Sequence, residues 1–337
     1  AGIVPTTKAF AEPGSVFLWG GYDDDGLFGS YAEEHGSPAY TTFGDAEEGL
    51  QKLRAGAEFD LAWPCQGEIK RWVRAGVLEP LDPSRIENWN DMFPEVRDLP
   101  SGMVDGKNYF APVDWGDTTL FYMPDRVTWM NDDNESFDLM EDPRVKGKVG
   151  ILDSAADSLF LMMHHLGIDI REQDQLTKAA IDQGINKFRE MRDNGQIRAF
   201  FGDTSSMVEA LGNEEIDVAL GWNEIAWNAG AKMMQPSNGT MTWACGLAIV
   251  KGADLDKAYA MINGATSAET SAYLLSEWGY GHSNKAGFST LTADELAERG
   301  VAANPADHLS NGMFSVMPTD EVTDYMEAQW AEMVAGG

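Results

Sequence analysis

Short apolar segments alternate with helical patterns in the first third of the chain, and this alternation constrains the fold most strongly. Each expected strand is followed by a segment with apolar residues at helical spacing. Asp45 stands where the cap of one of these helices is expected. Strand–helix alternation favours a parallel, doubly wound α/β sheet. The expected elements, in chain order, are a strand at 16–19, a helix at 26–34, a strand at 40–43, a helix at 45–55, a strand at 59–63 and a helix at 68–75.

The alternation returns in the second half, after a stretch at 128–142 that is rich in Asn, Asp and Glu and predicts a surface excursion. A chain of 337 residues exceeds the usual size of a single core, so two lobes are expected. The expected elements of this half are a strand at 149–152, helices at 154–166 and 174–194, strands at 217–222 and 247–250, and a C-terminal helix at 319–335.

The charge balance excludes several classes of partner. Lys and Arg number 24 against 55 Asp and Glu, a formal charge of −31, which repels phosphate backbones and anionic lipid surfaces. No apolar run approaches the roughly 20 residues that span a bilayer, so no direct membrane insertion is expected. The chain begins at Ala1, which is compatible with a removed signal peptide or with trimming, and we expect an exported protein.

Motifs for chemistry are absent from the sequence. It contains no phosphate-binding G-x-x-x-x-G-K-S/T, no H-E-x-x-H, no G-x-S-x-G and no G-x-G-x-x-G. The run 22–26 resembles the start of a calcium loop, but Gly21 and Ala32 occupy ligand positions that require acids. We therefore expect no metal, no cofactor and no catalytic residues. An enzyme with Cys65 as nucleophile and His282 as base is an alternative without a local signature.

Five of the eleven tryptophans lie in short corners marked by glycine, proline or cysteine. Turns at element ends are where folds present ligand-contacting side chains, whereas a core tryptophan is normally carried on a periodic face. The placement favours a lined cleft, and the alternative is that these rings fill gaps in the core. The five are Trp19, Trp63, Trp115, Trp222 and Trp243.

Six runs, at 17–22, 59–65, 111–116, 219–223, 241–248 and 279–286, resemble successive landmarks of the periplasmic spermidine/putrescine-binding proteins of ABC importers. The resemblance extends over nearly the whole chain. It implies the two-lobed periplasmic-binding-protein fold of type II, each lobe a doubly wound mixed sheet flanked by helices, with two crossing hinge strands. The expected lobes are 1–118 plus 246–290 and 119–245 plus 291–337. The resemblance also implies a monomer that closes on one small ligand in a cleft between the lobes and delivers it to transmembrane permease subunits.

The resemblance also implies roles for particular residues. Family tryptophans at the positions of Trp19, Trp222 and Trp243 pack on a polyamine, while acids clamp its amino ends. Two of these acids are missing here, because Cys245 and Ile225 stand at their positions. Asp157 matches a family glutamate, and Cys65 replaces a hydroxyl residue.

The missing acids lead to our first hypothesis for the ligand. Burying a primary ammonium without acceptors costs several kcal/mol, whereas a methylated onium head has no donors and suits aromatic faces. We therefore expect a sulfonium or quaternary ammonium osmolyte, such as dimethylsulfoniopropionate, glycine betaine or choline, held by cation–π contacts. The expected cage is Trp19, Trp63, Trp115, Trp222, Trp243 and Tyr280, with Asn223, Ser154 or backbone N–H groups at Gly20 as anchors for a ligand carboxylate.

A polyamine is the alternative ligand, if acids at shifted positions supply the clamp. The candidates are Asp114, Asp157, Glu224 and the run Asp23–Asp25. The resemblance further implies that Cys65 and Cys245 approach the cleft from opposite lobes. We expect free thiols there, and the alternative is a disulfide that would lock the receptor shut.

Overall fold

The computed structural model describes residues 10 and 12–336, and the chain divides into two compact units. Unit 1 comprises Ala1–Trp115 and Ala244–Leu291, and unit 2 comprises Gly116–Trp243 and Thr292–Gly337. The lobe boundaries expected from the sequence lie at 118, 245 and 290.

Unit 1 is built around a sheet in which β1 (Ser15–Trp19) pairs in parallel with β2 (Ala39–Phe43) and β3 (Leu61–Ala62). The strand β12 (Met241–Val250) pairs antiparallel with β3, which makes the sheet mixed. Its other elements are α1 (Tyr31–His35), α2 (Ala46–Arg54), α3 (Ile69–Arg74), β4 (Leu78–Glu79), α4 (Pro94–Arg97), β5 (Met103–Val104), β6 (Lys107–Asn108), α9 (Leu255–Ala265), α10 (Ala268–Tyr273) and β13 (Gly281–His282).

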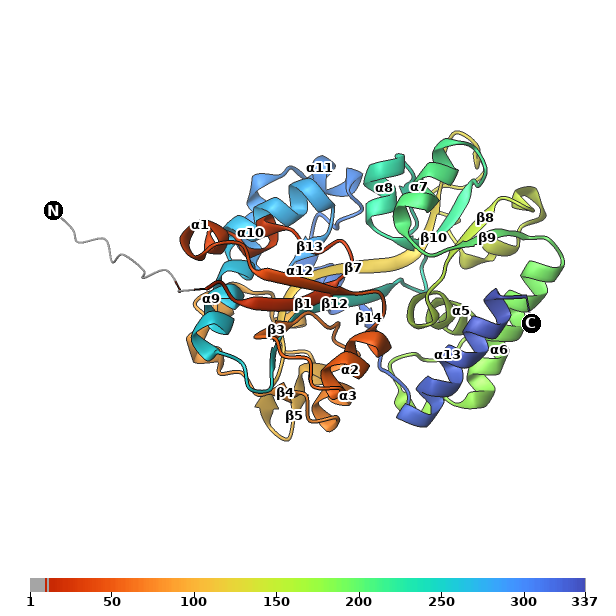
Figure 1. The fold of residues 1–337 in the computed structure, drawn as a ribbon. Helices are drawn as coiled ribbons and strands as arrows, with labels where there is room; N and C mark the ends of the chain where they lie inside the picture. The colour runs from red at the N-terminus through yellow and green to blue at the C-terminus, as the bar shows by residue number, and fades with distance from the viewer. Residues whose placement is uncertain (1–9, 11, 337) are drawn as a thin grey trace. The chain divides into compact units, whose positions relative to one another are not determined.

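Helix α2 shows how local sequence sets this unit. The Asp45 side chain accepts a hydrogen bond from the N–H of Glu48 at 2.8 Å, which caps the helix and confirms the expected start. Leu50 and Leu53 are buried in one cluster with Phe17 of β1, so α2 covers one face of the sheet. The alternation therefore produces the expected helix–sheet layering (Figure 1).

The helix expected at 26–34 is wrong as a single element. A 3-10 turn at Asp25–Phe28 is followed by α1, and Gly29 separates the two with φ +55°. A side chain at Gly29 would also meet the carbonyl oxygen of Gly264 on α9. Close packing against α9 and a left-handed backbone therefore break the helix at this glycine.

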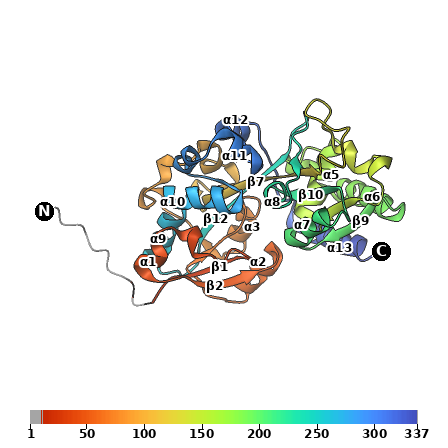
Figure 2. The same cartoon turned by 90° about the horizontal axis from the view of Figure 1, so that it is seen from above.

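Unit 2 has its own mixed sheet, in the order β7-β10-β8-β9. The strand β10 (Val218–Trp222) is antiparallel to β7 (Ala111–Tyr122) and parallel to β8 (Val149–Leu152), and β9 (Ile197–Phe201) continues in parallel. The remaining elements are α5 (Phe160–His165), α6 (Lys178–Asp193), α7 (Thr204–Gly212), α8 (Glu224–Ala229), β11 (Lys232–Met233), α11 (Ala293–Glu298), α12 (Pro305–Ser310), β14 (Met313–Phe314) and α13 (Asp320–Val334). Helices α6 and α13 lie side by side (Figures 1 and 2).

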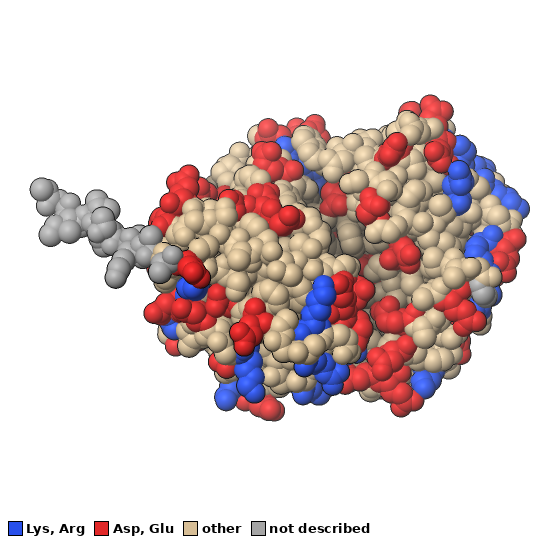
Figure 3. All heavy atoms as spheres, in the orientation of Figure 1, with Lys and Arg blue, Asp and Glu red and all other residues tan. Residues whose placement is uncertain are grey.

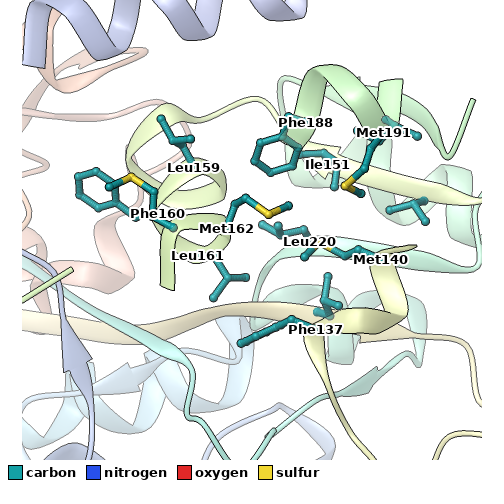
Figure 4. Packing of buried hydrophobic residues seen from close by; sticks show 14 of the residues in the cluster. Phe137, Met140, Ile151, Leu159, Phe160, Leu161, Met162, Phe188, Met191 and Leu220 are labelled. Atoms are coloured by element: carbon teal, nitrogen blue, oxygen red, sulfur yellow. The ribbon is translucent and has the colours of Figure 1, made fainter. Parts of the chain in front are cut away.

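The core of unit 2 is made of aliphatic, aromatic and methionine side chains. Phe188 of α6, Ile151 of β8 and Leu220 of β10 meet in this cluster (Figure 4). Phe137 and Met140, which lie in the stretch expected as a surface excursion, are also fully buried there. The sequence did not predict that these two residues are buried, because Asn, Asp and Glu residues surround them in the chain.

Two strands, β7 and β12, pass from one unit to the other. β7 belongs to unit 1 up to Trp115, and β12 belongs to unit 2 up to Trp243. The expected crossing strands are thus confirmed, although β12 is longer than the expected strand at 247–250. A side chain at Gly246 of β12 would collide with the backbone of Ala111 on β7, so this approach within unit 1 requires glycine.

Within residues 10 and 12–336, no helix is both long and apolar enough to cross a membrane. Acidic side chains are spread over the face of each unit drawn in Figure 3, with basic side chains in smaller groups.

Candidate functional site

In unit 2, a carboxylate and a tryptophan lie side by side at the end of the sheet. The Asp157 carboxylate accepts hydrogen bonds from the Trp222 indole N–H at 3.1 Å, the Thr118 hydroxyl at 2.8 Å and the Ser154 hydroxyl at 2.7 Å. Asp157 and Trp222 are each partly exposed. We call this group the acid–aromatic cluster of unit 2, defined by Asp157, Trp222, Thr118 and Ser154.

Local structure explains why these residues meet. Trp222 ends β10 and stands opposite Thr118 in the antiparallel register with β7. Ser154 caps the π-helical turn Ala155–Leu159 and accepts from the N–H of Asp157, so the carboxylate is held at the start of this turn. The helix expected at 154–166 is therefore a π-helical turn that leads into α5.

Trp243 joins the same region of unit 2 from β12. A side chain at Gly116 would collide with the Trp243 ring and with the Asn223 side chain, so both pack directly on this glycine. Asn223 is 1% exposed, its amide oxygen accepts from the N–H of Asp117, and its amide nitrogen donates to the carbonyl of Gly300. Because both ends of this amide are engaged within unit 2, the structure gives no support to Asn223 as an anchor for a ligand carboxylate.

A second carboxylate meets aromatic side chains in unit 1. Asp114 of β7 is 1% exposed and accepts from the Trp63 indole N–H at 2.9 Å and from the Tyr22 hydroxyl at 2.8 Å. Burial raises the pKa of Asp114 to about 6, although both hydrogen bonds act in the opposite direction. Asp114 is one of the acids that the polyamine alternative names as replacements, at shifted positions, for the missing family acids.

Two aromatic residues of this group, Tyr22 and Trp278, were not among the expected site residues. The Tyr22 ring lies edge-on to Trp63 at 5.5 Å and to Trp278 at 5.0 Å between ring centroids. Trp278 in turn lies 6.3 Å from Tyr280, which is almost fully buried. Tyr22 is the last residue of the run 17–22, which resembles the family, so the sequence could have indicated it as a site residue. Trp278 lies just outside such a run.

Trp19 and Gly20 also lie in unit 1, at the end of β1. Trp19 is partly exposed and packs on Phe43 with ring centroids 4.7 Å apart. The N–H of Gly20 donates to the carbonyl of Phe43 at 3.0 Å, so the sheet already uses this expected anchor. The ring of Trp19 is the part of this corner that a ligand could contact.

Trp63 and Trp115 are core residues of unit 1, with exposures of 0% and 1%. The Trp63 indole N–H is engaged by Asp114, and that of Trp115 donates to the carbonyl of His282 at 3.0 Å. The Trp115 ring also stacks on Phe288. For these two tryptophans the structure supports the gap-filling alternative more than a role as cage walls.

The expectation of free thiols is wrong. Cys65 and Cys245 form a disulfide, and both residues belong to unit 1, so they do not approach from opposite lobes. The strand β12 runs antiparallel past the corner after β3, and the N–H of Gln66 donates to the carbonyl of Ala244 at 2.8 Å. This pairing brings the two Cα atoms to 3.8 Å.

The disulfide also removes the enzyme alternative, because Cys65 has no thiol. His282 is fully buried, with Nε2 near the carbonyl of Ala265 and Nδ1 accepting from the N–H of Asn284. Burial lowers the pKa of His282 to about 4, against the effect of these hydrogen bonds, so it is neutral at pH 7. His282 is a structural residue.

The other acids named from the sequence have local partners. The Asp24 carboxylate accepts from the Tyr273 hydroxyl at 2.8 Å and from the N–H of Gly26, and Asp25 accepts from Tyr40. Burial raises the pKa of Glu224 to about 7, and a hydrogen bond from Thr204 opposes this shift. Among the residues that the structure describes, no group of His, Cys, Asp and Glu side chains is arranged to hold a metal ion.

Comparison with known proteins gives a consistent result. The sequence model of the family described as bacterial extracellular solute-binding proteins matches residues 37–297. The putrescine-binding periplasmic protein PotF of Escherichia coli K12 is 25% identical over 99% of this chain and 94% of its own length. A putrescine/agmatine-binding protein of Pseudomonas aeruginosa is 26% identical over 92% of this chain and 87% of its own length.

A solved structure of a protein with a similar name has the same fold. The solved structure of a putative spermidine/putrescine ABC transporter protein from Listeria monocytogenes superimposes with a TM-score of 0.82 and 22% identity, over 96% of this chain and 99% of that one. This likeness confirms the expected α/β binding-protein fold of type II. Because the family model spans well over half of the sequence, the chain belongs to the bacterial extracellular solute-binding proteins, a family of binding proteins for transport and not of enzymes.

Proposed function

We propose that this protein captures a diamine or polyamine of the putrescine class in the periplasm and delivers it to the transmembrane subunits of an ABC importer. The observation that carries this proposal is the partly exposed Asp157 carboxylate beside the Trp222 ring. An alkyl ammonium requires a carboxylate for its N–H donors and suits an aromatic face for its charge and methylene groups. Relatives aligned over most of the chain carry putrescine in their names, which supports the same class.

The hydrogen bonds of Asp157 leave room for one ammonium. A carboxylate has about four acceptor positions. Thr118, Trp222 and Ser154 use three of them, so about one position is left for a ligand. Asp157 is one of the shifted acids that the polyamine alternative required.

A methylated onium compound is the second candidate, and one observation favours it. Cys245, at the position where polyamine-binding relatives were expected to carry an aspartate, is a half-cystine and has no charge to offer an ammonium. A trimethylammonium or dimethylsulfonium head needs no such acceptor and would rely in unit 2 on the aromatic faces of Trp222 and Trp243. The named relatives support the polyamine alternative better than this first hypothesis.

Calorimetric titration of the purified protein at fixed salt decides between the candidates. Putrescine, spermidine, choline, glycine betaine and dimethylsulfoniopropionate would be compared side by side. Saturable binding of putrescine or spermidine with no heat from the methylated compounds supports the proposal. Binding of a methylated onium without binding of any diamine would overturn it and establish the second candidate.

A further inference from the structure

One buried carboxylate of unit 2, Asp117, lies behind the acid–aromatic cluster. It stands on β7 between Gly116 and Thr118 and is 1% exposed. Successive side chains of a strand point to opposite faces of the sheet. Gly116 and Thr118 face the two tryptophans and Asp157, so the Asp117 carboxylate lies on the other face.

Three donors from other segments converge on this carboxylate. It accepts from the hydroxyls of Thr240 at 3.1 Å and Thr242 at 2.8 Å, and it pairs with Nε2 of His308 at 2.9 Å. Thr242 directly precedes Trp243 on β12, and His308 belongs to α12. Asp117 therefore joins β7, β12 and α12 within unit 2.

The backbone of Asp117 makes a corresponding link to the other tryptophan. Its N–H donates to the amide oxygen of Asn223, which directly follows Trp222 at the end of β10. Asn223 in turn donates to the carbonyl of Gly300, in the same C-terminal segment that carries α12. Each tryptophan thus has a sequence neighbour hydrogen-bonded to Asp117.

We infer that Asp117 and His308 are positioning residues that hold Trp222 and Trp243 in place for the ligand and make this placement depend on pH. The inference rests on the proposed function for its effect on affinity, but not for its effect on the tryptophans. His308 is the histidine of this network, and histidine is the side chain whose ordinary pKa lies near neutral pH. Neither residue needs to touch the ligand.

The groups around His308 determine the sign of the pH effect. Asp117 on β7 is the charged partner of His308, and Asp307 precedes His308 on α12. The hydroxyls of Thr240, just before β12, and of Thr242 on β12 donate to the same Asp117 carboxylate and are neutral. Burial lowers the pKa of His308, but the charge and hydrogen bond of Asp117 outweigh burial and raise the pKa above its ordinary value. The stabilisation is fully present below the ordinary histidine pKa and is lost as the pH rises through the raised value.

The test compares His308→Gln with a matched control, His165→Gln. His165 also lies in unit 2 and pairs with the carboxylates of Asp138 and Glu141, at 3.6 Å and 3.7 Å. Near-ultraviolet circular dichroism of the tryptophans and putrescine affinity would be measured between about pH 5.5 and 8.5, where a primary ammonium keeps its charge. Thermal unfolding of each variant checks that it is folded.

The wild type and His165→Gln are expected to lose affinity about tenfold as the pH rises, together with a change in the tryptophan signal. The His308→Gln and Asp117→Asn variants should bind putrescine weakly at every pH, and their tryptophan signal should not change with pH. A folded His308→Gln variant with the wild-type pH profile would overturn the inference. If no putrescine binds to any form, the proposed function fails, and the tryptophan signal still decides whether His308 positions the rings.

Discussion

The indole N–H of Trp222 donates a hydrogen bond to the carboxylate of Asp157, at 3.1 Å. The contact joins the end of a strand to the start of a π-helical turn, and it orients an aromatic face and a negative charge together. The same pairing recurs in unit 1, where the Trp63 indole donates to Asp114. The two contacts differ in exposure, because Asp157 is partly exposed and Asp114 is buried.

Asp157→Asn should weaken putrescine binding by about 10- to 100-fold, because a hydrogen bond to a charged group contributes about 1.5–3 kcal/mol. Asp153→Asn is the matched control, since Asp153 also accepts from a tryptophan indole of unit 2, Trp330, at 2.7 Å. Calorimetric titration of both variants measures the effect. Equal affinities of the two variants would contradict the role of Asp157.

Trp222→Ala and Trp243→Ala should abolish ligand binding with only a small loss of stability, because both rings are partly exposed. Trp63→Ala should instead lower the free energy of unfolding by about 3–5 kcal/mol, since it empties a buried site. Chemical denaturation and binding would be measured on all three variants. An early-melting Trp222→Ala variant that still binds its ligand would assign that ring to the core.

The Cys65–Cys245 disulfide should resist labelling until the protein is reduced. Thiol counting under denaturing conditions is expected to give no reactive thiols before reduction and two after it. The bridge spans 180 residues of sequence, and its removal should destabilise the protein by roughly 3–5 kcal/mol through the entropy of the unfolded chain. Two reactive thiols before reduction would contradict the disulfide and support free cysteines instead.

Asp114 should make unit 1 less stable as the pH rises. Its pKa of about 6 in the folded state exceeds the ordinary value of 3.8, so the folded protein holds a proton that the unfolded chain has released. The stability that this group contributes is highest below about pH 4 and is lost as the pH rises to about 6. It is constant above that range.

Asp114→Asn removes this titration. The difference in melting temperature between wild type and variant should therefore change between about pH 4 and 6 and stay constant at higher pH. Taking the difference cancels the titration of the many other carboxylates. A difference that does not vary across this range would show that Asp114 titrates normally.

Much of the architecture could be predicted from the sequence. The strand–helix alternation predicted β1, α2 and β8, because a buried strand and an amphipathic helix have different apolar periods. The strand β7 was missed, since all twelve of its residues are buried and it therefore lacks an alternating pattern. A resemblance in ordered runs, rather than periodicity, identified the family.

By itself, the sequence determined the fold class, the family and the residue types available to a ligand, because these depend on local pattern and on the order of motifs. Only the tertiary structure decided which tryptophans are core, which acids lie beside them and how the cysteines pair. Trp63 and Trp222 look alike as strand-end corners, yet one is fully buried and the other is partly exposed. Cys65 and Cys245 meet because β12 returns antiparallel past the corner after β3, a contact across 180 residues that no local pattern encodes.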